Sequence, residues 1–137
     1  MAEASAIVAG DELPPIELSI DRESLVRYAG ASDDYVRQHW DHAFMIANGY
    51  PDVLTHGWLT FAHMCRVVTD WAPADAAIAR YAVRYHQPLY PGRLRCGGRV
   101  DSVEGDTVDL SLWGRNADDQ LVASATVALT HRLSRNH

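Results

Sequence analysis

Lysine is absent from this chain of 137 residues, and every basic side chain is an arginine. A mechanism that forms a Schiff base on a lysine is therefore excluded. The chain also lacks a block of basic residues, and its formal net charge is −6. An acidic protein of this kind is not expected to have nucleic acid as its main partner.

Cysteines and long apolar runs are scarce as well. The two cysteines, Cys65 and Cys96, have no CxxC neighbour. We interpret them as small apolar side chains of the core in a reducing compartment. No run approaches the roughly 20 apolar residues of a membrane helix, and no charged-then-apolar leader opens the chain. We therefore expect a cytoplasmic protein that does not enter a membrane.

What is present fits an ordinary globular protein, with 47% apolar and 22% charged residues. At this length about two thirds of the unfolded surface can be buried. We expect a single domain over residues 1–137, of which residues 1–12, small and polar, are loose.

The first regular segment combines an extended arm with a helix. The stretch LPPIELSI (13–20) predicts an edge strand, because its two prolines stand at its start. Asp21 is placed to cap the following helix, and Gly30 predicts where that helix ends.

Residues 32–49 allow two interpretations. Apolar residues recur at helical spacing, which favours a single helix over 33–48. In the other interpretation the chain is a loop through His39, and Asp41 caps a short helix over 42–48.

The choice between them decides the chemistry of this stretch. Residues five apart on one helix point about 140° away from each other, so Asp34 and His39 would not face one substrate. In the loop interpretation His39 is free to turn toward Asp34, and we expect Val36 and Trp40 to pack inward and anchor the loop.

The segment from Gly57 to Trp71 predicts a long helix that is apolar on nearly all sides, and such a helix is buried. A small domain with a buried helix needs a sheet to wrap it. Four stretches in the second half have strand character and are separated by turns, which predicts an antiparallel meander. The fold class is therefore α+β, with a long central helix wrapped by a curled antiparallel sheet; the expected strands are 77–89, 93–103, 107–116 and 120–133.

Several histidines have less specific interpretations. His56 directly precedes the long helix and is expected to be a turn and cap residue. His63 lies on that helix and is expected to be a hydrogen-bonded core histidine. A metal site built from His39, Asp41 and His42 lacks convincing geometry, so we expect no metal.

Three separated stretches carry a family resemblance. YAGASDDYVRQHWD (28–41), THGWLT (55–60) and VRYHQPLYPGRL (83–94) resemble, in the same order, the signature motifs of the MaoC-like, (R)-specific enoyl-CoA hydratases. The similarity covers roughly residues 13–133. It implies the hot-dog fold, in which a curled antiparallel sheet wraps a central helix.

The resemblance also implies roles for three residues. Asp34 and His39 fall on the catalytic acid–base pair of the family, and the main-chain N–H of Gly57 falls on its oxyanion-binding donor. No cofactor and no metal are implied. A water activated by the pair would attack the alkene, while the free N–H groups of the helix N-terminus would hold the charge on the thioester oxygen.

Two positions depart from the family pattern. Asp33 stands where the family has Gly, and Val36-Arg37 stands where it has Asn-Pro. A proline would break a helix through the motif, so its absence leaves the continuous-helix interpretation open.

The expected function is (R)-specific hydration of a trans-2-enoyl thioester, carried by CoA or by an acyl carrier protein, or the reverse dehydration. Two alternatives are a non-catalytic partner subunit of a heteromeric hydratase, favoured by the missing Asn-Pro, and a hot-dog acyl-CoA thioesterase. The resemblance implies a homodimer or a heterodimer with a related hot-dog subunit. It leaves the acyl group open between a fatty chain, a polyketide and a steroid side chain.

Overall fold

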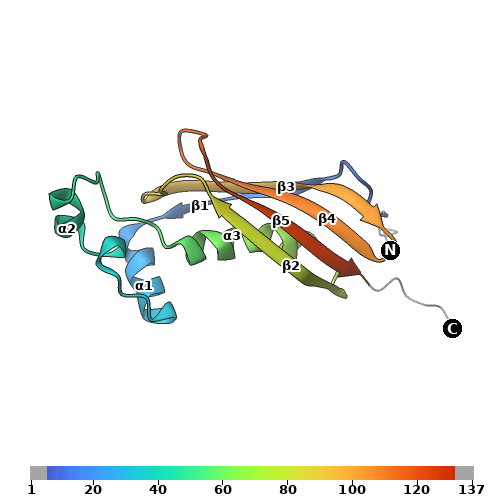
Figure 1. The fold of residues 1–137 in the computed structure, drawn as a ribbon, viewed down its shortest axis with the longest axis horizontal. Coiled ribbons are helices and arrows are strands. Elements are labelled where there is room, and N and C mark those ends of the chain that lie inside the picture. Colours follow the sequence, from blue (N-terminus) through green and yellow to red (C-terminus); the bar gives the residue numbers. More distant parts are fainter. Residues whose placement is uncertain (1–5, 132–137) are drawn as a thin grey trace.

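The helices and strands of the chain are seen in a computed structural model that describes residues 6–131 (Figure 1). In chain order they are β1 (Glu12–Ile20), α1 (Arg22–Ser32), the 3-10 helix η1 (Arg37–His39), α2 (His42–Ala47), α3 (Gly57–Trp71), β2 (Ala76–Tyr85), β3 (Gly92–Glu104), β4 (Thr107–Arg115) and β5 (Leu121–His131).

The strands form one antiparallel sheet with the order β1-β3-β4-β5-β2. The predicted meander is therefore correct for β3, β4 and β5 and wrong for β2, which pairs with β5 at the sheet edge.

Residues 86–91 connect β2 to β3 across the sheet, and an extended stretch of six residues reaches about 20 Å. In the sheet β3 lies three strand positions from β2, a distance of only about 14 Å, so the connection is long enough. Pro88 and Pro91 lie in this connection, which crosses the sheet and does not pair as a hairpin, so their missing N–H groups cost no strand hydrogen bonds.

Helix α3 lies against one face of this sheet (Figure 1). Its residues Met64, Val67 and Val68 are buried, whereas Trp58 is 66% exposed. The prediction that α3 is buried on nearly all sides is wrong for the single chain, because the sheet covers only one side of the helix. No helix within residues 6–131 has the length and apolar character needed to cross a membrane.

The edge strand and the first helix follow the sequence closely. Asp21 caps α1 as predicted, since the Ser24 amide donates to its carboxylate at 2.7 Å. The helix does not end at Gly30, as predicted, but continues to Ser32, because one glycine inside a helix costs only about 1 kcal/mol. It ends where Asp33 adopts a left-handed conformation, with φ of 58°.

Part of the N-terminal segment expected to be loose lies outside the described residues, namely residues 1–5. Within the described part, Gly10 and Asp11 exchange main-chain hydrogen bonds with Val100 of β3, at 2.9 and 2.8 Å. The regular pairing of β1 with β3 begins at Glu12.

Residues 33–56, here called the pre-helix segment, adopt the loop interpretation and not the continuous helix. A single turn of 3-10 helix ends at His39, and Asp41 caps the short helix α2. The expected inward packing is wrong, since Val36 and Trp40 are 55% and 46% exposed. The Trp40 indole instead donates to the main-chain oxygen of Tyr35 at 2.8 Å, which holds the turn from outside.

Candidate active site

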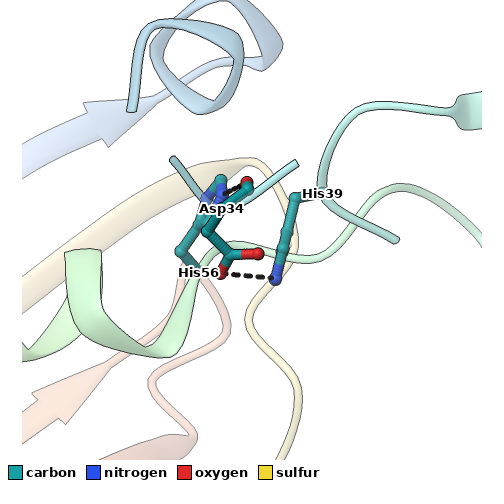
Figure 2. A group of neighbouring side chains, drawn as sticks. All are labelled: Asp34, His39 and His56. Carbon is teal, nitrogen blue, oxygen red and sulfur yellow. Dashed lines mark hydrogen bonds and ion pairs between the residues drawn. The ribbon is translucent and has the colours of Figure 1, made fainter. Parts of the chain in front are cut away.

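Asp34 and His39 lie close together in the pre-helix segment. The chain turns tightly between them, because the left-handed Asp33 ends α1 and the His39 amide donates to the Val36 carbonyl at 3.0 Å. The Asp34 carboxylate is 3.8 Å from Nε2 of His39 (Figure 2). The structure thus brings together the two side chains that the sequence selected as a pair.

The ring of His39 is 6% exposed and is oriented by two hydrogen bonds. Its Nδ1 lies 2.7 Å from the carbonyl oxygen of Leu54. Because a carbonyl only accepts, Nδ1 must carry the hydrogen, and Nε2 of the neutral ring has the lone pair that accepts. The side-chain amide of Gln38 donates to this Nε2 at 3.2 Å. The basic nitrogen of His39 therefore faces Asp34.

His56 is the third member of this cluster, and the sequence interpretation missed its role. It stands at the N-cap position of α3 as predicted, but its side chain makes no capping hydrogen bond. Its ring is 1% exposed and stacks on that of His39, with centroids 3.8 Å apart and planes 18° apart. Its Nε2 lies 3.2 Å from the main-chain oxygen of Asp34 (Figure 2).

The N-terminus of α3 forms a neighbouring group of donors. The amides of Leu59 and Thr60 donate to the His56 carbonyl, whereas those of Gly57 and Trp58 have no main-chain acceptor among the described residues. Free amides at a helix start attract negative charge. The Tyr85 hydroxyl donates to the Gly57 carbonyl at 2.6 Å and fixes this turn.

Gly57 has a steric reason to be glycine. A Cβ at this position would lie 3.1 Å from Cζ of Tyr85, closer than ordinary contact. Burial raises the pKa of the Tyr85 phenol, so the hydroxyl remains a donor at neutral pH. The ring of Tyr85 and the bare Cα of Gly57 thus fit closely at the start of the helix.

A cavity of about 300 Å³ connects these two groups. His39 and Gly57 line it, together with the buried Thr55, whose hydroxyl has no partner among the described residues. The rest of its wall is mainly apolar and includes Leu54, Thr60, Tyr85, His86, Gln87, Pro88, Leu89 and Val122.

Asp34 is not among the residues that line this cavity. Its carboxylate is 36% exposed and approaches the cavity only through Nε2 of His39. The 3.8 Å separation of the two groups is too long for a direct hydrogen bond. A water hydrogen-bonded to both atoms, about 2.8 Å from each, would lie beside the line that joins them.

The ligand atoms of Asp34, His39 and His56 lie within 4.8 Å of one another, close enough for a metal ion to be tested against their geometry. A zinc ion requires ligand lone pairs that converge on a point about 2.0–2.1 Å from each nitrogen. The two histidine rings are stacked and nearly parallel, so their in-plane lone pairs do not converge. The arrangement fits an acid–base site better than a metal centre.

The remaining charged residues of the stretch have other partners. Asp41 accepts from the Phe44 amide at 2.9 Å and pairs with Arg37, which confirms it as the helix cap. Both the Phe44 amide and Arg37 hold the pKa of Asp41 below its usual range. Asp33 is the C-cap of α1. Within the described residues, His39, Asp41 and His42, which the sequence did not favour as a metal site, do not form a cluster of ligand atoms.

The chain matches the MaoC like domain family over residues 6–120. A search of curated proteins found no match. Among solved structures, the ChsH1-ChsH2 complex from Mycobacterium tuberculosis contains a chain with 29% identity and a TM-score of 0.85, and the match covers 93% of this chain and 100% of that one.

Two hydratases have a similar fold at lower identity. The R-hydratase PhaJ1 from Pseudomonas aeruginosa has 18% identity and a TM-score of 0.82, with 90% of this chain and 81% of that chain covered. The (R)-hydratase from A. caviae involved in PHA biosynthesis has 13% identity and a TM-score of 0.80, with 93% and 99% covered.

Proposed function

The chain belongs to the MaoC-like domain family and has its α+β hot-dog fold, as the sequence predicted; from this premise we propose that it hydrates a trans-2-enoyl thioester to the (R)-3-hydroxyacyl thioester, or catalyses the reverse dehydration. The observation that carries the proposal is the position of His39 and Gly57 on the walls of one cavity, with Asp34 beside His39. One wall supplies an acid–base pair and the other supplies donors for a developing negative charge.

The acid–base steps follow from the hydrogen bonds of His39. Its Nδ1–H is held by the Leu54 carbonyl, so Nε2 takes a proton from a water shared with Asp34. The water oxygen bonds to C3 of the enoyl group as the C2–C3 double bond opens. The proton then returns from the pair to C2, so that the elements of water are added across the double bond. Asp34 stabilises the imidazolium in between.

The electrostatic step uses the helix N-terminus. Addition at C3 moves negative charge onto the thioester oxygen, which the free amide of Gly57 would bind. The adjacent Trp58 amide is also free and adds to the favourable field of the helix dipole. The apolar wall, with Leu54, Leu89 and Val122, would receive the acyl chain.

The test is a spectrophotometric assay of the purified chain with crotonyl-CoA and longer enoyl-CoAs. We expect loss of enoyl absorbance without added metal and an (R)-3-hydroxy product on chiral analysis. Release of free thiol in place of hydration would identify a hot-dog thioesterase. Loss of turnover with EDTA would contradict the metal-free mechanism.

A second candidate function is a subunit that completes a related catalytic subunit. It is supported by the similarity to a chain of the ChsH1-ChsH2 complex and by the missing Asn-Pro at Val36-Arg37. If the purified chain is inert on every chain length but active after co-expression with a related hot-dog chain, this candidate replaces the first.

Either candidate includes a dimer, formed with a second copy or with a related hot-dog subunit. Strand β2 is a free edge of the sheet in the described chain; Tyr85, which lines the cavity, and Trp58, which follows Gly57 on α3, are both exposed. Free sheet edges and exposed aromatic side chains are the features that assembly covers. Sedimentation that shows a stable and active monomer would contradict this part of the proposal.

A further inference from the structure

His56 contacts both members of the acid–base pair, and its role is assigned by none of the comparisons. We propose that His56 is a positioning residue: it stays neutral, holds the main chain at Asp34 and supports the ring of His39, so that His39 alone carries the proton. The inference rests on the proposed hydration. Figure 2 shows the arrangement, with the Asp34 carboxylate directed to His39 and the Asp34 main-chain oxygen directed to His56.

The hydrogen bond to Asp34 fixes the tautomer of His56. A main-chain oxygen only accepts, so Nε2 of His56 carries the hydrogen and donates it at 3.2 Å. The other nitrogen, Nδ1, is buried and has no partner among the described residues. A proton added there would have no acceptor in a buried place, which is unfavourable. Burial accordingly lowers the pKa of His56; the hydrogen bond to Asp34 offsets part of this shift, and charge on His39 adds to it.

His39 has the opposite arrangement. Its Nδ1–H is already bound by the Leu54 carbonyl at 2.7 Å, and its Nε2, which accepts from the Gln38 side-chain amide, faces the Asp34 carboxylate. A proton added to this Nε2 meets a negative charge 3.8 Å away. The two stacked rings are therefore not equivalent: His39 meets the charged carboxylate of Asp34, whereas His56 meets its neutral main-chain oxygen.

The stack explains why the neutral state of His56 matters. Its ring centroid is 3.8 Å from that of His39, a distance at which two positive rings would repel. The ring of Tyr28 makes a T-shaped contact with His56, with centroids 4.9 Å apart, so the ring of His56 is held by two aromatic neighbours. The titratable groups that face His56 are Asp34, His39 and Tyr28.

His39 and Gly57 line the cavity, but His56, which stacks on His39 and directly precedes Gly57, does not. It therefore acts through Asp34 and His39 and does not contact the substrate. A positioning residue of this kind should change kcat and leave KM nearly unchanged.

The kinetic test compares two substitutions that each keep one half of the contact. His56→Phe keeps an aromatic ring against His39 and removes the donor to Asp34. His56→Gln keeps a donor and removes the stack. Each should lower kcat about tenfold, less than the loss expected on removing a reacting group, with KM within about twofold.

The matched control is His63→Gln. His63 lies on α3, is half-buried, and like His56 has a buried Nδ1 without a partner among the described residues. This corrects the expectation of a hydrogen-bonded core histidine. His63 does not line the cavity. The kcat of His63→Gln should stay within about twofold of wild type.

Each kinetic result has a defined consequence. Wild-type kcat in His56→Phe would overturn the role of the Asp34 hydrogen bond, and wild-type kcat in His56→Gln would overturn the role of the stack. A fall of about a hundredfold or more, together with a raised KM, would mean that His56 contacts the substrate and is not a positioning residue.

Nitrogen NMR of the histidine rings tests the charge assignment in the wild-type protein, without any substitution and independently of activity. As the pH is lowered, the ring of His56 should keep the neutral Nε2–H tautomer below the pH at which a free histidine is protonated, and it should still be neutral when His39 is charged. Protonation of His56 with His39 left neutral would overturn the inference. If the wild-type chain shows no hydration, the proposed function fails, and this titration still decides which ring carries the charge.

Discussion

The two walls of the cavity are constructed in different ways. The wall that contains His39 belongs to the pre-helix segment and is held by single hydrogen bonds from side chains to main-chain oxygens, such as those of His39 to Leu54 and His56 to Asp34. The wall that contains Gly57 is the first turn of α3, where the backbone itself supplies the donors.

This difference predicts different sensitivities. In the pre-helix wall the chemistry resides in side chains, so removing one functional group should abolish a step. In the helix wall the chemistry resides in main-chain amides, which no substitution removes without proline. Added volume is what should disturb that wall, since the space beside Gly57 is filled by Tyr85.

The largest effects should come from the pre-helix wall. Asp34→Asn keeps the shape of the side chain and removes its charge, and His39→Ala removes the imidazole. Each should lower kcat in the enoyl-CoA assay by about a hundredfold or more. The double variant should be little worse than either single variant, because the two groups act on one water.

The control for this prediction is Asp33→Asn, which changes the neighbouring acid at the C-cap of α1. It should stay within a few-fold of wild type. If Asp33→Asn were inactive and Asp34→Asn active, Asp33 and not Asp34 would be the carboxylate that acts with His39.

In the helix wall, Gly57→Ala should have a smaller effect. The added Cβ would lie 3.1 Å from the Tyr85 ring and push the first turn away from its place, so kcat should fall about tenfold. Replacing Tyr85 by Val in the same chain should recover part of the loss. Full activity in Gly57→Ala alone would contradict the close fit of these two residues.

Gly30→Ala is the matched glycine control. A Cβ at Gly30 would lie 3.6 Å from the hydroxyl of Tyr35, which is an ordinary van der Waals contact. The position lies inside α1 and is exposed. We expect unchanged kcat and a gain in stability of roughly 0.5–1 kcal/mol, measured by urea unfolding.

The sequence predicted the helix wall better than the pre-helix wall, for a physical reason. Helix α3 was predicted over Gly57–Trp71 and is observed there, because apolar periodicity over many residues is a strong local signal. The neighbours of β2 were predicted wrongly, since strand order depends on contacts between distant residues that the period-two pattern does not contain.

In the pre-helix segment the sequence left two interpretations open and missed two features. It placed Asp34 and His39 together but expected Val36 and Trp40 inside, although a short irregular segment has no periodicity that would show which side faces out. It also missed the contacts of His56. The signal available for His56 was its position directly before Gly57, at the start of a helix, which by itself does not show where the ring points.

The pH dependence of stability tests two histidines with lowered pKa, His56 behind the pre-helix wall and His63 on α3 away from the cavity. Burial lowers the pKa of His56 and of His63. The unfolded chain then binds protons below about pH 6.5 that the folded chain does not, so the free energy of unfolding should fall as the pH is lowered through that range. Urea unfolding at about pH 7.5 and pH 5.5 measures this fall.

The substitutions sharpen the assignment. His56→Gln and His63→Gln should each reduce the difference in unfolding free energy between the two pH values, whatever they do to stability at neutral pH. An unchanged difference in His56→Gln would mean that its ring is protonated equally in the folded and unfolded chain.

The smallest effect is expected from Asp41, and it separates a structural carboxylate from a reacting one in the same segment. Asp41 caps α2 through the Phe44 amide and pairs with the exposed Arg37. Asp41→Ala should lower the urea midpoint slightly and leave kcat within about twofold. Because asparagine caps a helix about as well as aspartate, Asp41→Asn should be close to wild type in both measurements. The same Asp-to-Asn change at Asp34 should remove most activity and little stability, because that carboxylate is needed for its charge.

The stabilising effect of Asp41 should also depend on pH. Because hydrogen bonds lower the pKa of Asp41, its contribution to the free energy of unfolding is present above about pH 4 and is lost as the pH falls further. A loss of kcat in Asp41→Asn comparable to that in Asp34→Asn would show that the charge near His39, and not the position of one carboxylate, sets the activity.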